Sequence, residues 1–97
     1  MSNVVNAAVD ALNAKLGSFD DGTAKFVIED EGAIMIDSDG ARAADDAAES
    51  EVTLTASRET FEGMLNGDVN PTTAFMTGKL KVDGNMGLAM KLGSALA

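Results

Sequence analysis

The segment that decides the fold covers residues 78–97 and reads GKLKVDGNMGLAMKLGSALA. Its first part alternates, because Leu80 and Val82 are apolar and their neighbours are charged, which predicts a strand over 79–83 with one buried face. The apolar residues then change to the period of a helix, over 85–97. A strand that leads directly into a long apolar helix indicates a fold that mixes sheet and helix.

The helix predicted over 85–97 is apolar around more of its circumference than a surface helix requires. At about 100° per residue, its apolar side chains cover an arc of roughly 220°. An ordinary surface helix buries a stripe of about 100° or a little more. One face of a sheet cannot cover this whole arc, so another helix, a second subunit or a bound apolar molecule must cover the remainder.

Methionine is concentrated in the same part of the chain. Four of the six methionines, Met64, Met76, Met86 and Met90, fall in predicted helices of the second half. Methionine is flexible and polarisable, so it suits a surface that adapts to an irregular ligand. It fills irregular gaps in a core equally well, and spacing alone leaves both interpretations open.

The rest of the sequence predicts a two-layer α+β domain. Strands with an apolar face and a mostly polar face form a sheet that is covered on one side only, and the helices must lie on that side. The first strands can form a meander, and the two short helices between Ala56 and Lys79 are long enough for a crossover to a parallel strand. We therefore expect a single domain over 1–97 with one five-stranded, antiparallel-rich mixed sheet covered on one face by helices. Its further elements are helices over 5–16, 57–67 and 70–78, and strands over 24–29, 33–37, 41–44 and 51–56.

Composition excludes several classes of function. The net charge is −9, from 16 acids against 7 bases, and such a chain is repelled by nucleic acid and favours a soluble monomer. The sequence has neither cysteine nor histidine, so it lacks the thiolate, the usual general base and the commonest metal ligands. We expect no catalysis, no metal and no cofactor. There is no signal peptide and no apolar run long enough to span a membrane, which predicts a cytoplasmic protein.

Two polar features have simple interpretations. The run from Asp37 to Gly40 lacks the ligand spacing of a calcium loop and predicts a turn. Lys79, Lys81 and Lys91 are the only clustered bases, and we expect them to solvate the outer faces. Contact with an anionic lipid head or a CoA phosphate is the alternative.

The C-terminal third resembles the signature of a known family. Residues 70–92, and above all Gly78–Val82 followed by Gly84–Leu92, are similar to the C-terminal signature of the sterol carrier protein 2 family. The resemblance implies a five-stranded sheet with helices on one face, and non-covalent binding and transfer of sterols, fatty acids, fatty acyl-CoA or phospholipids. It also implies an apolar tunnel beside the C-terminal helix. The final residues, Ala95–Ala97, do not match the peroxisomal address found in eukaryotic members.

We therefore expect a non-catalytic carrier of a small apolar lipid, with transient membrane contact. The alternative is an interaction module of the same fold, in which a partner or a second copy covers the surplus apolar helix face. The expected core residues, a subset of which would line the cavity, are Phe26, Ile28, Ile34, Ile36, Leu54, Phe61, Leu65, Phe75, Met76, Leu80, Val82, Met86, Leu88, Met90 and Leu92.

Overall fold

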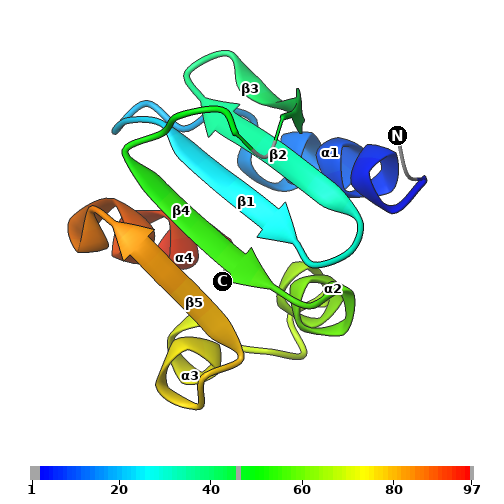
Figure 1. Ribbon diagram of the computed structural model, residues 1–97, viewed down its shortest axis with the longest axis vertical. Coiled ribbons are helices and arrows are strands. Elements are labelled where there is room, and N and C mark those ends of the chain that lie inside the picture. Colours follow the sequence, from blue (N-terminus) through cyan, green and yellow to red (C-terminus); the bar gives the residue numbers. More distant parts are fainter. Residues whose placement is uncertain (1–2, 46, 97) are drawn as a thin grey trace.

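The computed structural model describes residues 3–45 and 47–96 and confirms the α+β class (Figure 1). Asp46 of the acidic loop and Ala97 of the apolar arc lie outside the described residues. Every predicted helix and strand is present, with ends within two residues of those expected. The elements are α1 (Asn3–Leu16), β1 (Ala24–Ile28), β2 (Gly32–Asp37), β3 (Gly40–Ala44), β4 (Val52–Ala56), α2 (Arg58–Asn66), α3 (Pro71–Met76), β5 (Leu80–Gly84) and α4 (Met86–Leu96).

The strands form one mixed sheet in the order β3-β2-β1-β4-β5. The meander is confirmed, because β1 pairs with β2 and β2 with β3 in antiparallel register. The expected parallel strand after the two short helices is wrong, because β4 and β5 pair antiparallel, with Leu54 opposite Val82. The parallel pair is instead β1 with β4, which the chain reaches after passing through β2 and β3. Helices α2 and α3 thus return the chain to the end of the sheet at which β4 finishes, and β5 starts there opposite Ala56.

The outer face of the sheet is less open than the sequence suggests. The connection from β3 to β4 has to cross β2 and β1, and it does so on the face opposite the helices (Figure 1). Lys25 points to that side, and its ammonium group donates a hydrogen bond to the Ala48 carbonyl at 2.8 Å. Lys25 and its cross-strand neighbour Met35 are consequently buried.

Local signals in the sequence set the helix ends. The side chain of Ser57 caps α2 by accepting from the Thr60 amide, and Gly67 ends the helix in the left-handed region. The side chain of Asn70 caps α3 in the same way, with Pro71 in the first turn. In α4, the Leu88 amide donates to the Asn85 side chain at 3.1 Å.

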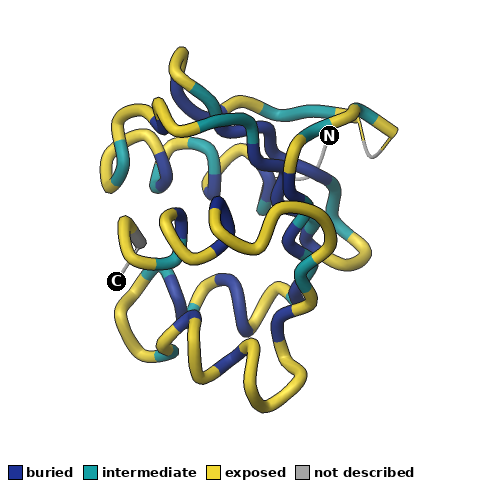
Figure 2. The backbone as a smooth tube through the Cα atoms, turned by 90° about the vertical axis from the view of Figure 1, so that its left-hand side faces the viewer, coloured by how far each residue is buried: buried dark blue, intermediate teal, exposed yellow. Residues whose placement is uncertain are grey.

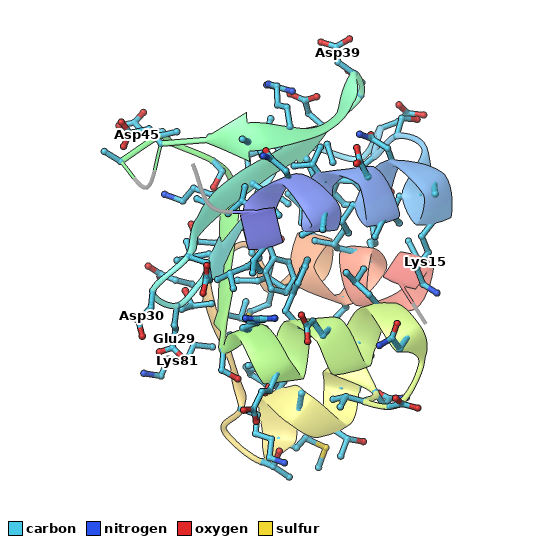
Figure 3. The ribbon with its side chains drawn as sticks, turned by 90° about the vertical axis from the view of Figure 1, so that its right-hand side faces the viewer. Lys15, Glu29, Asp30, Asp39, Asp45 and Lys81 are labelled. Atoms are coloured by element: carbon cyan, nitrogen blue, oxygen red, sulfur yellow. The ribbon has the colours of Figure 1, made fainter. Side chains whose placement is uncertain are left out.

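The helices pack on the inner face of the sheet, which the side view shows as a second layer (Figure 3). Asn13 of α1 holds the edge strand β3, since its amide group accepts from the Ala41 N–H at 2.8 Å and donates to the Ala41 carbonyl at 2.9 Å. Phe61 of α2 meets Phe26 of β1 edge-to-face, with ring centroids 4.5 Å apart. Such a pair adds about 0.5–1.5 kcal/mol beyond its burial.

The turn from β5 into α4 requires glycine. Gly84 has φ +106°, and a Cβ built there would lie 2.5 Å from the Glu51 carbonyl oxygen. That carbonyl also accepts a hydrogen bond from the Asn85 amide at 3.0 Å. The start of α4 is therefore pressed against the start of β4, and this contact fixes where α4 leaves the sheet.

We predict that Gly84→Ala destabilises the protein much more than Gly78→Ala does. Gly78 also has positive φ, at +80°, but a Cβ there meets nothing within 4 Å. The control should lose only the cost of the left-handed conformation, about 1–2 kcal/mol. Gly84→Ala adds a backbone clash that no rotamer relieves, for a total of about 3 kcal/mol or more. Urea unfolding measures both free energies, and equal losses would contradict the proposed contact.

Candidate functional site

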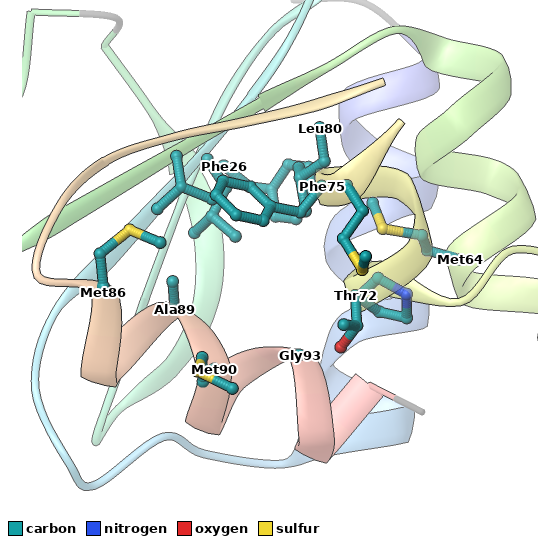
Figure 4. Close-up of a pocket in the computed structure, with 13 residues that line it drawn as sticks. Phe26, Met64, Thr72, Phe75, Leu80, Met86, Ala89, Met90 and Gly93 are labelled. Atoms are coloured by element: carbon teal, nitrogen blue, oxygen red, sulfur yellow. The ribbon is translucent and has the colours of Figure 1, made fainter. Parts of the chain in front are cut away.

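An apolar pocket of about 280 Å³ opens between the inner face of the sheet and the helices of the second half (Figure 4). Strands β1, β4 and β5 form its floor, α2 and α3 form one wall, and α4 forms the other. The cavity lies beside α4. The tight turn between β5 and α4 makes this helix run back across the inner face of the sheet, so that α4 forms a side of the cavity. The residues that line it are Phe26, Leu54, Met64, Pro71, Thr72, Phe75, Met76, Leu80, Val82, Met86, Ala89, Met90 and Gly93.

The apolar arc of α4 divides into a buried part and a part that faces the pocket mouth. Leu88, Ala89 and Leu92 are buried against the rest of the protein, and Met86 and Met90 face the pocket mouth. Figure 2 shows the consequence, since buried and exposed residues alternate along the helix that ends near the C-terminus. The protein itself therefore covers only part of the surplus apolar surface.

The predicted residues divide between the pocket and the closed core. Those that line the pocket are Phe26, Leu54, Phe75, Met76, Leu80, Val82, Met86 and Met90. Those that are buried in the core away from it are Ile28, Ile34, Ile36, Leu88 and Leu92. Phe61 packs on Phe26, and together with the half-buried Leu65 it lies along a separate groove between α1 and α2.

Sequence reasoning did not name five of the lining residues, which are Met64, Pro71, Thr72, Ala89 and Gly93. Signals existed for three of them: Met64 belongs to the methionine set, and Ala89 and Gly93 lie on the arc of α4. No local pattern marks Pro71 and Thr72, which serve as the first turn of α3. They reach the pocket because α3 packs against α4, where a Cβ added at Gly93 would lie 3.4 Å from the Pro71 Cβ.

The mouth of the pocket is apolar and partly exposed. Met76 is 78% exposed and Met90 66%, and Met86 and Phe75 are 44% and 42% exposed. All four line the cavity, and the close-up view labels Phe75, Met86 and Met90 around it (Figure 4). We call these four side chains the rim.

The pocket is suited to holding an apolar molecule rather than to converting one. No charged side chain lines it, and Thr72 supplies the only side-chain hydroxyl among the lining residues. The described part of the chain holds no group of three or more acidic residues placed to bind a metal ion. The Arg42 guanidinium lowers the pKa of the Asp37 carboxyl through a paired hydrogen bond, but this pair belongs to the β2–β3 turn and does not line the pocket.

Within residues 3–45 and 47–96, none of the helices has the length and apolar character needed to cross a bilayer.

Curated relatives match part of the chain closely. Peroxisomal multifunctional enzyme A of Dictyostelium discoideum is 51% identical over 45 residues, which is 46% of this chain and 10% of that protein. Human sterol carrier protein 2 is 49% identical over 43 residues, 44% of this chain and 8% of that protein. The chain thus spans about a tenth of the length of these relatives.

Solved structures match the whole chain in shape. The solution structure of sterol carrier protein 2 from Aedes aegypti in complex with palmitate has a TM-score of 0.74 and 23% identity. The match covers 100% of this chain and 97% of that one. At this identity the likeness establishes the fold.

The model of the SCP-2 sterol transfer family matches residues 4–97, which is nearly the whole sequence. With the five-stranded sheet, the helical layer and the apolar pocket beside α4, this match identifies the chain as a member of the SCP-2 sterol transfer family.

Proposed function

We infer that the protein binds one fatty acyl chain in the pocket and carries it without any covalent step. The observation that carries this proposal is a cavity of about 280 Å³ whose lining has no charged side chain. Apolar surface removed from water contributes roughly 25 cal/mol per Å², so an acyl chain gains free energy by entering. Nothing in the lining would activate a nucleophile or a water molecule, so carriage is the chemistry that the site supports.

The polarity of the lining predicts how the ligand lies. A carboxylate at the inner end would be buried without a partner, which costs far more than the tail gains. The methyl end therefore points inward, towards Phe26 and Leu54. The carboxylate or thioester end stays at the mouth, where water, Thr72 and the rim surround it.

The size of the pocket favours a single flexible chain. A volume of about 280 Å³ is at the small end of ligand sites, which typically measure about 300–1,000 Å³. A flexible chain can follow a narrow apolar path and leave its head outside, whereas a rigid sterol or a two-chain phospholipid needs a wider cavity. The palmitate in the Aedes aegypti relative agrees with this choice.

The interaction-module hypothesis remains as a second candidate, because the exposed rim is itself an apolar surface that a protein partner could cover. In that case the protein would bind no lipid in solution. We keep the carrier as the proposal because the four rim residues surround a cavity and do not form a flat or convex patch.

We predict saturable binding of a fluorescent fatty acid, and a loss of affinity of about tenfold in Met90→Asp. Met90 is largely exposed in the empty protein, so a carboxylate there stays hydrated and should change the melting temperature little. It would however face the bound tail and the ligand carboxylate. Ser94→Asp is the matched control, because Ser94 is an exposed residue of the same helix that does not line the pocket.

Titration of both variants gives the affinities, and thermal unfolding gives the stabilities. If Met90→Asp lowered the melting temperature strongly but left the affinity unchanged, Met90 would be ordinary core. If no fatty acid saturated the wild-type protein, the carrier proposal would fail.

We further predict that removing bound lipid lowers the melting temperature and that added fatty acid restores it. A ligand at 100 times its dissociation constant stabilises the folded state by about 2.7 kcal/mol. In a domain of this size, such a change raises the melting temperature by roughly 10 °C or more. Calorimetry at increasing fatty acid concentration measures the shift. An unchanged melting temperature after delipidation would favour the interaction module.

A further inference from the structure

We propose that the rim of the pocket is a docking surface for a phospholipid bilayer. The rim consists of Phe75, Met76, Met86 and Met90. The inference rests on the proposed function, because it names the surface from which the acyl chain enters and to which it leaves.

The first observation is where exposed apolar side chains lie. Among the described residues, the large hydrophobic side chains found exposed are those of the rim, and every one of them also lines the pocket. Exposed apolar side chains that cluster in one place mark interaction sites, whereas isolated ones need no explanation. Three of the four are methionines, whose flexible side chains adapt to a fluid surface.

The second observation is the distribution of charge. Residues 70–97 contain Lys79, Lys81 and Lys91 against one acid, Asp83, and so carry a net charge of +2. Residues 1–69 must then carry −11 to give the total of −9. The elements that form most of the rim, α3 and α4, thus belong to a C-terminal segment of this acidic chain that carries a net positive charge.

The positions of the lysines sharpen this point. The Lys79 backbone amide donates to the Ala74 carbonyl at 2.8 Å, so Lys79 lies at the end of α3. Lys91 follows Met90 on α4, and its pair with Asp21, at 3.6 Å, is exposed on both sides and therefore weak. Lys81 alternates with Leu80 and Val82, which face the pocket, so it lies on the outer face of the sheet. Figure 3 shows Lys81 on the side of the sheet away from the helices.

The net negative charge of residues 1–69 does not prevent contact with an anionic membrane when the rim faces that membrane. The molecule measures 28 × 27 × 25 Å, and charges in solution are screened over about 8 Å at physiological ionic strength. With the rim on a membrane, acids on the far side lie well beyond that range, whereas Asp21, which pairs with Lys91 at 3.6 Å, stays close to α4. Lys79 follows α3 and Lys91 follows Met90 on α4, so these two lysines adjoin the rim elements, and their charge attracts an anionic bilayer.

A bilayer fits the rim better than a protein does. Stable protein interfaces bury about 800 Å² on each partner, far more than four side chains around an opening provide. A fluid membrane requires no complementary shape, and phosphate groups lie at the depth that lysine side chains reach. Docked in this way, the pocket mouth faces the acyl region, so the ligand passes between membrane and protein without crossing water.

The absence of tryptophan allows a direct test of insertion, because a single introduced tryptophan is then the only indole in the chain. Met76→Trp places it on the rim, and Val27→Trp places it on the outer face of the sheet as a control. The probe is vesicles of equal parts phosphatidylcholine and phosphatidylglycerol. We expect the emission of Met76→Trp to shift to shorter wavelength on vesicle addition, and that of Val27→Trp to stay unchanged. Equal shifts, or no shift in either, would overturn the proposal.

Charge reversal tests the orientation independently. Lys79→Glu, Lys91→Glu and Lys81→Glu change the net charge equally, and none of these residues lines the pocket. Vesicle co-sedimentation should weaken about tenfold in the first two and remain near wild type in Lys81→Glu. Equal weakening in all three would show that net charge alone governs the association, and would contradict docking through the rim.

Two further measurements separate this proposal from the proposed function. Fatty acid titration without vesicles should be unchanged in all three lysine variants. If wild type bound fatty acid but the vesicle results failed, the docking surface alone would be wrong. If wild type bound no fatty acid, the carrier function itself would fail. Sedimentation without lipid should give a monomer, and a dimer that Met76→Glu dissociates would assign the rim to a second copy and overturn the proposal.

Discussion

The structure depends on a mismatch between the apolar surface of α4 and the sheet surface available to cover it. The tight turn at Gly84 leaves α4 pressed against the start of β4, so the helix must lie across the inner face of the sheet. Leu88 and Leu92, on one side of the apolar arc of α4, are buried against the rest of the protein. The other edge faces α3 across a gap that protein side chains do not fill, and this gap is the pocket.

The same mismatch explains why the mouth is made of methionine. Under the proposed function, a residue at the mouth must tolerate water when the pocket is empty and pack on a ligand when it is full. Met86 and Met90 are one helical turn apart on α4, and Met76 ends α3 on the opposite side of the opening. Their unbranched side chains change rotamer at little cost, so the entrance can widen without movement of the helices.

The chemistry of the pocket and the membership of the SCP-2 sterol transfer family point the same way. A lining without charge favours transfer of an intact molecule over its conversion. Some relatives are multifunctional enzymes, but this chain matches only about a tenth of their length. Residues 70–97 carry a net charge of +2 in an otherwise acidic chain, and the proposed orientation on a membrane rests on this difference.

The sequence by itself determined the elements, the class of fold and the excess apolar surface on the last helix. These properties follow from local periodicity and from capping residues such as Ser57 and Asn70. It also indicated the family, because residues 70–92 carry an ordered signature. Only the tertiary structure decided which apolar residues line the pocket. The spacing of apolar residues in the sequence marks both Ile34 and Met90 as core positions and does not distinguish them. Strand order places Ile34 on β2, which packs against α1, in the closed core, whereas Met90 lies at the α3–α4 gap. The parallel pairing of β1 with β4 likewise depends on contacts between distant segments, which no local pattern encodes.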